Sequence, residues 1–557
     1  MRRALLLILL SIPTFFVFLG SAAITDSDEA YYAEASREMI ESGDWITPRF
    51  NYELRFEKPI LFYWMVAATY AVAGVSEGAA RFWAAMSGVG LVMVAYATGR
   101  RWIDDDAGFL GGAITATSFA AAAMARQSLP DLPLAFFITL AVWAGYEALA
   151  PAQAPPGGWS PRRWLLLSSA ACALATLTKG PVGLALPVLI VGSAVVLEYF
   201  FGEVPRRAPR IRLLDLLPAL ALFVLIAVPW YAAVTWVHGS GYLYRFFVGE
   251  NLDRFATARY NDPRPFWFYI PILIGGLLPW SIFGFLWLRR PSAGSQFGNS
   301  ATRTRLIMWA VVPLAIFSVS VGKQPRYILP CLVPLAILLG STISSRVRAS
   351  ASAGRDVPLT IAGVLAGAVL LLVGVLLFRA APLVTAAGGG GTAPWSILVV
   401  TCALAVILVA AQRSARLLPA TLAVSSALTL LSLYGAVLAS PGAEPVIVAA
   451  QAVTREGTPE LRVCACGAFL RNLPFYVRSH IVPAGTQEEV NAVLSADTPT
   501  TAVIDLRKLA EAEMALSRRF ERLAEIPYLN TALLRIDDFL YPDPERALQR
   551  VVIIRTR

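Results

Sequence analysis

The 557-residue sequence has few charged residues for its length. Only 15% of the residues are charged, whereas soluble domains average about 25%, and 57% of the residues are hydrophobic. The mean hydropathy is correspondingly high, at +0.61. This composition excludes an ordinary soluble globular protein and predicts a protein that spans a membrane.

Nucleotide-binding motifs and a disulfide framework are also missing. No Gly-rich phosphate loop of either usual type is present, which argues against direct use of a nucleotide. Three of the five cysteines, Cys172, Cys331 and Cys402, fall in apolar runs, where packing is the default interpretation. Cys464 and Cys466 would face the same side of a predicted strand, and a redox or metal pair there is the minor alternative.

The apolar residues are concentrated in long runs that are almost free of charge. A helix needs about 20 residues to cross the hydrocarbon core, so runs of this length predict spanning helices. The first run follows Arg2 and Arg3 and ends in small residues, so a cleaved signal peptide is the alternative interpretation for it. The thirteen runs lie at 4–23, 82–99, 107–125, 131–150, 163–177, 182–201, 213–236, 266–288, 305–321, 326–344, 357–378, 394–411 and 417–440.

The arginines indicate the orientation of these spans. Cytoplasmic loops carry an excess of Lys and Arg, and with a cytoplasmic N-terminus every inside loop here is basic. An odd number of spans then places the C-terminus outside. Because topology accounts for much of the net charge of +10, no nucleic acid is needed to explain it. The inside arginines are Arg100, Arg101, Arg162, Arg163, Arg206, Arg207, Arg210, Arg212, Arg289, Arg290, Arg303, Arg305, Arg346, Arg348, Arg355, Arg413 and Arg416.

The expected fold class is therefore a polytopic α-helical membrane protein with about thirteen transmembrane helices and a small extracytoplasmic α/β domain. We expect a membrane domain at 1–444, with a first outer loop at about 24–80, and a soluble domain at 445–557. Within the outer loop, helical spacing predicts a helix at 30–42 and an interfacial helix at 59–73. In the tail we expect a helix near 507–523 and strands at 461–466, 502–506, 532–536 and 550–555.

The few lysines are placed against this topology. Only four lysines are present, and Lys58, Lys179 and Lys323 fall in Gly/Pro-bounded segments of outer loops. A cation placed against the positive-inside bias indicates an anionic partner at the outer surface, and phosphate is the obvious candidate. Contact with anionic lipid headgroups is the alternative interpretation for any single residue.

Carboxylates gather on the same side of the membrane. Asp26, Asp28 and Glu29 directly follow the first run, and Asp131 opens the fourth. Acids favour helix N-termini, so capping explains one or two of them but not all. Carboxylates that face phosphate-binding cations at headgroup depth suit group transfer from a lipid phosphate. The cations stabilise the charge of the leaving phosphate, and an Asp accepts the proton of an acceptor hydroxyl.

A set of short motifs occurs in an order that we identify with one family. The sequence resembles the bacterial branch of the protein O-mannosyltransferase superfamily, and most closely the aminoarabinose transferases that modify lipid A. Each motif is weak by itself, but the ordered set covers nearly all of the membrane domain. The motifs are Asp28-Glu29-Ala30-Tyr31-Tyr32-Ala33, Gly43-Asp44-Trp45, Phe56-Glu57-Lys58-Pro59, Pro130-Asp131, Lys179-Gly180-Pro181, 250–255, 262–267, Leu278-Pro279-Trp280 and 323–330.

The resemblance implies roles for particular residues. Asp28 matches the loop aspartate central to catalysis, with Glu29 beside it, and Asp131 matches the second loop acid. Lys58 would hold the carrier phosphate and Tyr327 would line the same pocket. The predicted donor-phosphate group is Lys58, Lys179, Lys323, Arg326 and Tyr327.

Two departures from the aminoarabinose transferases bear on the sugar and on a metal. Those enzymes tend to have Arg at the position of Tyr31 and His at the position of Asn251. That His is associated with a bound divalent metal, so its replacement argues against metal binding, for which Glu57 is the one candidate ligand. The same departures keep hexose and pentose donors open.

The sequence thus predicts an inverting glycosyltransferase of the bacterial inner membrane. It would move a sugar from a polyprenyl phosphate to lipid A or another envelope acceptor on the outer face, among membrane lipids. A protein O-mannosyltransferase-like or other envelope glycan transferase is the alternative. A transporter or flippase fits less well, because it usually has ionisable residues near the middle of its spans, and here the middles are essentially uncharged.

Overall fold

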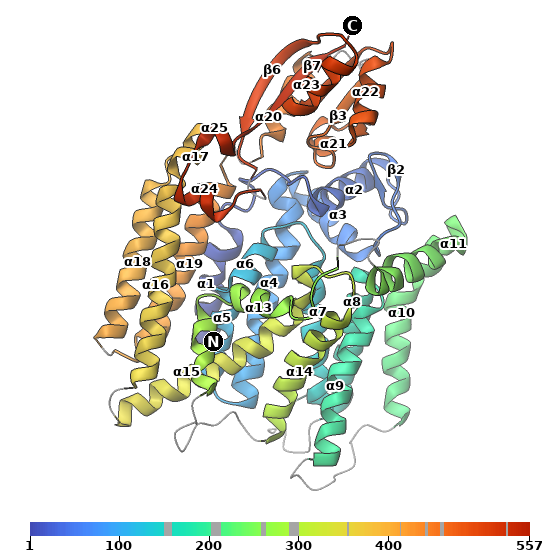
Figure 1. Cartoon of the computed structure of the whole chain (residues 1–557). Coiled ribbons are helices and arrows are strands. Elements are labelled where there is room, and N and C mark those ends of the chain that lie inside the picture. Colours follow the sequence, from blue (N-terminus) through green and yellow to red (C-terminus); the bar gives the residue numbers. More distant parts are fainter. Residues whose placement is uncertain are drawn as a thin grey trace.

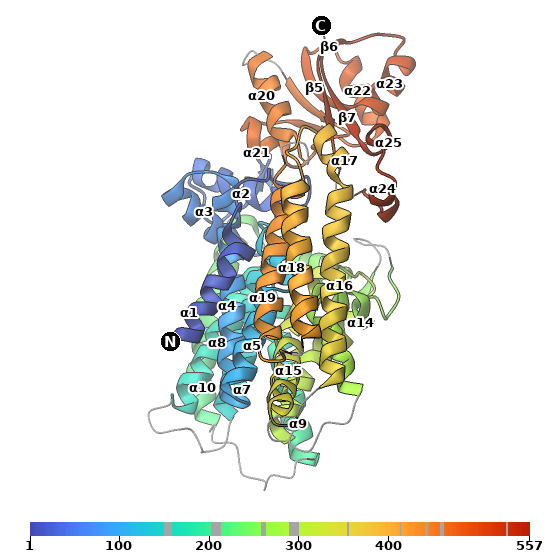
Figure 2. The same ribbon diagram turned by 90° about the vertical axis from the view of Figure 1, so that its left-hand side faces the viewer.

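A bundle of long helices carries a small sheet domain at one end (Figures 1 and 2). This computed structural model describes residues 1–556 except 150–158, 202–212, 258–262, 289–299, 354–355, 413, 441–443, 457–461 and 531–532. Between the bundle and the sheet domain lie α2 (Asp28–Ser42) and α3 (Leu61–Ala73), the helices of the first outer loop. The polytopic helical fold predicted from the apolar runs is confirmed.

Nine helices of the described residues are long and apolar enough to cross a membrane, or up to eleven if two bent pairs each count as one span. The bent pairs are Asp105–Ala116 (α5) with Phe119–Ala125 (α6), and Tyr269–Gly276 (α13) with Trp280–Trp287 of η3 (Trp280–Leu288). The nine are Glu77–Trp102 (α4), Asp131–Leu149 (α7), Val182–Phe200 of α9 (Val182–Phe201), Leu214–His238 of α10 (Leu213–His238), Ser300–Val319 (α14), Pro325–Ser350, Val357–Ala386, Ala393–Ala411 (α18) and Leu418–Leu438.

Three of these spans combine shorter elements. Pro325–Ser350 joins η4 (Pro325–Cys331) to α15 (Leu332–Ala353). Val357–Ala386 joins α16 (Val357–Arg379) to α17 (Ala381–Ala386), and Leu418–Leu438 joins α19 (Leu418–Leu433) to η5 (Tyr434–Leu438). The remaining two predicted runs are helical but are not among these candidates: 4–23 carries α1 (Arg2–Ser11) and η1 (Ile12–Phe16), and 163–177 lies in α8 (Pro161–Lys179). The count of thirteen therefore stays a prediction.

Capping residues in the sequence define where the helix α2 of the first outer loop begins and ends. Ser27 caps α2 by accepting a hydrogen bond from the Glu29 N–H, and Gly43 ends the helix with a left-handed φ of 68°. A two-stranded hairpin follows, β1 (Arg49–Phe50) and β2 (Glu53–Leu54). The predicted helices at 30–42 and 59–73 correspond to α2 and α3 and are confirmed as helices.

A second outer segment packs beside this loop. It comprises α11 (Gly241–Tyr244), η2 (Arg245–Asp253) and α12 (Arg254–Ala256). Phe56 of the first loop contacts Tyr242 of α11 edge-on, and His238 lies 2.8 Å from Thr47 Oγ1 through its Nε2. Asp262, the first residue of the motif at 262–267, lies outside the described residues.

The C-terminal domain is a five-stranded mixed sheet with helices on both sides. The strand order is β4-β3-β5-β7-β6, with β3 parallel to β4 and β5, and β7 antiparallel to β5 and β6. The helices are α20 (Val446–Glu456), α21 (Leu473–Val477), α22 (Gln487–Ser495), α23 (Leu506–Ala515), α24 (Ile536–Leu540) and α25 (Pro544–Ala547). The strands are β3 (Arg462–Cys466), β4 (Val482–Ala484), β5 (Thr500–Asp505), β6 (Glu521–Tyr528) and β7 (Gln549–Arg555).

Two expectations for this domain are wrong. The expected strand at 532–536 is absent from its described part, because the edge strand is β6 and Ile536 begins α24. The expected helix at 507–523 ends at Ala515, so its last residues belong to β6. The sequence pattern does not reveal β6, because this edge strand is largely exposed. Its charged residues, such as Glu521 and Arg522, therefore do not alternate with buried apolar residues.

The cysteine expectation also needs a correction. Cys464 and Cys466 form a disulfide within β3, whereas the sequence pattern offered a redox pair only as the minor alternative. Side chains two apart on a strand face the same side, as the sequence analysis predicted, which brings the two sulfur atoms together. Cys172, Cys331 and Cys402 are free and buried.

Candidate active site

Asp28 lies at the boundary between the bundle and the outer loop. It is the first residue of α2, and its side chain is 40% exposed to solvent. Asp131, the first residue of α7, is buried, with 4% of its side chain exposed. Both carboxylates therefore stand at helix N-termini, where the helix dipole favours their ionised form.

Arg326 joins the two carboxylates. Its Nη2 donates to Asp28 Oδ2 at 2.5 Å and its Nε lies 3.4 Å from Asp131 Oδ2. This arginine comes from the 3₁₀ turn η4, almost 300 residues after Asp28 and about 200 after Asp131 in the chain. The fold thus brings together three residues that the sequence analysis singled out separately.

Lys179 completes this cluster. Its ammonium donates to Asp131 Oδ1 and lies 4.8 Å from the centre of the Tyr327 ring. The lysine ends α8, and Gly180 follows it with a φ of 99°, which only glycine adopts readily. We call Asp28, Asp131, Lys179 and Arg326 the acid–base cluster.

The ion pair with Arg326 controls the ionisation of Asp28. Partial burial acts to raise the pKa of Asp28, but the charge of Arg326 and its hydrogen bond outweigh burial and hold that pKa below its usual range. The charge of Arg471 acts in the same direction. Asp28 is therefore ionised at neutral pH, and it becomes a better proton acceptor once another anion takes over Arg326.

Lys58 and Glu57 lie beside the cluster. Lys58 Nζ is 3.5 Å from Glu250 Oε2, and its charge acts on Asp131. Glu57 pairs with Arg55, whose Nη2 is 2.7 Å from Glu57 Oε2. Within the part of the chain that the structure describes, no group of three or more His, Cys, Asp or Glu residues could hold a metal ion.

Glu29 has a different environment from Asp28. It is fully buried, and its carboxylate accepts hydrogen bonds from Arg81 at 2.7 and 3.1 Å and from the Ser128 N–H at 2.9 Å. Arg81 in turn donates to the carbonyls of residues 19, 22 and 23. This network fixes the start of the outer loop, so Glu29 has the contacts of a residue that positions Asp28.

Lys323 also has structural contacts. Its ammonium is buried and donates to the carbonyls of Ser320 and, at 3.1 Å, Arg264. Arg126 likewise donates to the carbonyls of Pro13, Thr14 and Val17. Arg81 directly precedes the apolar run 82–99, and its role could not be read from the sequence because its partners come from residues 19–29.

Glu38 is another buried carboxylate on α2, and its ionisation makes the stability of the loop depend on pH. Burial and the neighbouring charge of Glu34 raise the pKa of Glu38 well above its usual range, although the Tyr52 N–H donates to it. The folded state therefore binds this proton more tightly than the unfolded chain, whose Glu pKa is about 4.3. Stability is then greatest at acid pH and falls as pH rises above that value.

We expect Glu38→Gln to raise the thermal unfolding midpoint at pH 8 by a few degrees, on the order expected for about 1 kcal/mol. The difference from the wild type should shrink as pH falls towards 4, where Glu38 is protonated in the folded state and most unfolded chains are protonated there as well. Unfolding followed by differential scanning fluorimetry in detergent, with Glu41→Gln as a control on the exposed side of α2, measures this. An equal shift at both pH values would contradict a proton held by Glu38.

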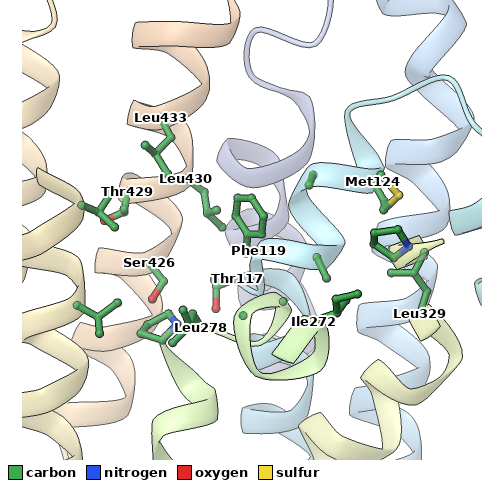
Figure 3. A pocket seen from close by; sticks show the side chains of 18 of the residues that line it. Thr117, Phe119, Met124, Ile272, Leu278, Leu329, Ser426, Thr429, Leu430 and Leu433 are labelled. Carbon is green, nitrogen blue, oxygen red and sulfur yellow. The ribbon is translucent and has the colours of Figure 1, made fainter. Parts of the chain in front are cut away.

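An apolar cavity of about 870 Å³ opens beside Arg326. Figure 3 shows side chains from α6, α13 and α19 pointing into it. Gln324 and Arg326 supply polar groups at one part of the wall, and almost all of the remaining lining is apolar. The lining residues include Thr117, Phe119, Ala120, Ala123, Met124, Ile272, Leu278, Leu329, Leu370, Val373, Ser426, Thr429, Leu430 and Leu433. A cavity of this kind fits a hydrocarbon chain whose polar end meets the acid–base cluster.

Comparison with known families supports the resemblance seen in the motifs. Residues 4–242 match the model of the dolichyl-phosphate-mannose-protein mannosyltransferase family. Over 358 residues the chain is 34% identical to undecaprenyl phosphate-alpha-4-amino-4-deoxy-L-arabinose arabinosyl transferase 2 of Pseudomonas fluorescens Pf-5, covering 62% of this chain and 57% of that protein. It is 33% identical over 354 residues to the corresponding transferase of Pseudomonas aeruginosa UCBPP-PA14, covering 62% and 61%. The chain thus aligns with about three fifths of the length of these relatives.

The same fold occurs in a solved structure. The crystal structure of ArnT from Cupriavidus metallidurans bound to undecaprenyl phosphate matches with a TM-score of 0.74 and 23% identity, over 99% of this chain and 97% of that chain. The match includes the C-terminal domain, so the whole architecture is shared and not only the bundle.

Proposed function

We propose that this polytopic membrane protein, which is related to the dolichyl-phosphate-mannose-protein mannosyltransferases and to the aminoarabinosyl transferases, is a glycosyltransferase that uses a polyprenyl-phosphate sugar. One observation carries the proposal. Arg326 both lines the apolar cavity and pairs with Asp28 and Asp131, so a lipid chain in the cavity would present its phosphate to the acid–base cluster.

The cluster suits the departure of a lipid phosphate. The bond between the anomeric carbon and the phosphate oxygen breaks, its electron pair stays on the phosphate, and Lys179 and Arg326 stabilise that charge as it develops. The acceptor oxygen attacks from the side opposite the leaving phosphate, so a single displacement inverts the anomeric configuration. If the acceptor is a hydroxyl, its proton goes to Asp28, and if it is a phosphate, Asp28 positions it.

Phosphate binding and proton transfer are linked through Arg326. In the structure Arg326 neutralises Asp28, and a carrier phosphate would compete for the same guanidinium. The pKa of Asp28 then rises towards its usual range, which makes the carboxylate a stronger base when the donor is in place. Lys58 supplies a further positive charge close to Asp131, whereas Lys323 is occupied by backbone carbonyls.

The proposal includes the organisation of the chain. Residues 1–444 form the catalytic membrane domain, with the active loop at about 24–80, and residues 445–557 form a periplasmic domain. The N-terminus is cytoplasmic in the inner membrane. The proposed acceptor is lipid A or a similar envelope molecule, and the sugar is a pentose such as 4-amino-4-deoxy-L-arabinose, which the names of the relatives specify. A hexose donor is the second candidate, favoured by Tyr31 and Asn251.

Filling the cavity tests the proposal. Ala123 lines the cavity, so Ala123→Trp should weaken binding of undecaprenyl phosphate about tenfold or more, because overpacking costs about 1–3 kcal/mol. Leu372→Trp is the matched control, since Leu372 is two residues after the lining residue Leu370 on α16 but is 57% exposed. Affinity is measured by native mass spectrometry of the purified protein. Equal affinity of Ala123→Trp and the control would place the lipid chain elsewhere.

A further inference from the structure

The C-terminal domain is docked on the segment that contains Asp28. The Arg471 N–H donates to Asp26 Oδ1 at 2.7 Å, and Asn472 Nδ2 donates to the Ile24 carbonyl at 2.9 Å. Tyr476 accepts from the Ile24 N–H at 2.8 Å and donates to Glu77. This set of contacts places residues 471–476 directly over the start of α2.

A second contact holds the hairpin of the loop. Asn51 exchanges two hydrogen bonds of 2.9 Å with the backbone of Ile481, as a neighbouring strand would. Asn51 and the next residue both have a positive φ, which the turn between β1 and β2 requires. The domain is therefore fixed to the loop at two separate points, and its position relative to Asp28 is defined.

The docking leaves the Arg471 side chain available. The side chain is exposed, and among the described residues its guanidinium forms no ion pair. It lies 5.4 Å from the centre of the Tyr31 ring, and its charge acts on Asp28. Because the backbone N–H makes the bond to Asp26, docking does not require the guanidinium.

Arg55 faces the same tyrosine from the loop. Its guanidinium lies 3.6 Å from the centre of the Tyr31 ring. Its Nη2 bonds to Glu57, while its Nε is buried without a hydrogen-bond partner among the described residues. A buried donor without a partner carries a free-energy cost that a bound anion would remove.

We propose that Arg471 and Arg55, on either side of the domain boundary at Tyr31, form an anion-binding subsite for a phosphate of the acceptor. The inference rests on the proposed function and adds the group that receives the acceptor. Arg471 acts on Asp28 through its charge from the C-terminal domain, whereas the carrier phosphate is placed at Lys179 and Arg326. The acceptor phosphate and the carrier phosphate would thus be held by different residues, as a transfer between two lipids requires.

The charges favour an anion over other ligands at this place. Two guanidiniums without a full set of carboxylate partners attract phosphate, which they bind through several N–H donors. A neutral sugar would not provide the Arg55 Nε and the exposed Arg471 with the charged hydrogen-bond acceptor that a phosphate offers. A headgroup phosphate of a bulk phospholipid has the same chemistry, so the experiment separates it from the acceptor.

The test uses the full-length protein in nanodiscs with a polyprenyl-phosphate sugar donor and lipid A as acceptor. Arg471→Ala should raise the KM for lipid A about tenfold or more, because a hydrogen bond to a charged group is lost. The Kd for undecaprenyl phosphate and kcat at saturating lipid A should change less than about twofold. Arg471→Lys should recover part of the loss. Arg478→Ala is the control, since its side chain is exposed in the same domain and it is the Arg478 carbonyl that accepts a hydrogen bond from Tyr52 of the loop.

The outcomes separate the inference from the proposed function. An unchanged KM for lipid A in Arg471→Ala, in a preparation that transfers sugar, would overturn the subsite alone. A weaker affinity for undecaprenyl phosphate would assign Arg471 to the carrier and would also overturn it. A loss of the Arg471 effect when vesicles of phosphatidylglycerol compete with lipid A would assign the subsite to bulk lipid. No transfer by the wild type with any donor would instead count against the proposed function.

Discussion

Asp28→Asn is expected to slow sugar transfer by orders of magnitude while leaving the carrier bound. The substitution keeps the shape of the side chain, so α2 still begins at this residue, but it removes the negative charge and the proton acceptor. A general base typically contributes about 10²–10⁴-fold to a rate, and kcat should fall by about that factor. Single-turnover transfer with the purified protein, together with the Kd for undecaprenyl phosphate, measures both effects.

The control for this variant is Asp44→Asn in the same loop. Asp44 accepts hydrogen bonds from the N–H groups of Ile46 and Thr47 and is outside the acid–base cluster, and an asparagine can still accept them. Its rate should remain close to that of the wild type. Full activity of Asp28→Asn would contradict any role of Asp28 in the reaction.

Arg326→Ala is expected to have the second largest effect, because this residue serves two purposes. The substitution removes the guanidinium that would hold the carrier phosphate, and hydrogen bonds to charged groups contribute about 1.5–3 kcal/mol each. Binding of undecaprenyl phosphate should therefore weaken by about 10- to 100-fold. It also leaves Asp28 and Asp131 close together with less positive charge, so the pKa of Asp28 rises and the acid limb of the pH–rate profile moves to higher pH.

Two further variants make this prediction specific. Arg326→Lys keeps a cation but loses the planar fork that reaches both carboxylates, so it should rescue binding only in part. Lys323→Met should lower stability by leaving the Ser320 and Arg264 carbonyls without their donor, with little change in carrier affinity. Equal carrier affinity of Arg326→Ala and the wild type would contradict a phosphate site at the cluster.

The sequence predicts the parts of this site that have a local signal. Long apolar runs fix the helices, and acids directly after such runs stand at helix N-termini, so Asp28 and Asp131 could be named in advance. Lys179 and Arg326 could also be named, because they are cations placed against the topological bias. What the sequence could not provide was their pairing, since Arg326 meets Asp28 only through the packing of distant helices.

The same limit applies to residues whose partners the sequence could not reveal. Glu29 and Lys323 carry the residue types of an active site, but their partners, Arg81 and two carbonyls, are defined only by the folded chain. Arg471 lies about 440 residues from Asp26, in a domain whose sequence offered no functional motif. A bond between Cys464 and Cys466 was only the minor alternative, because spacing alone does not distinguish two packed thiols from a disulfide.

The most direct test of the central claim is mass spectrometry of lipid A and other envelope glycolipids from a deletion strain. The strain is complemented with the wild type, with Asp28→Asn or with Asp44→Asn, each checked for insertion in the membrane. The account predicts that the wild type and Asp44→Asn restore a pentose- or hexose-sized adduct and that Asp28→Asn does not. An identical set of envelope glycolipids in all strains would contradict it.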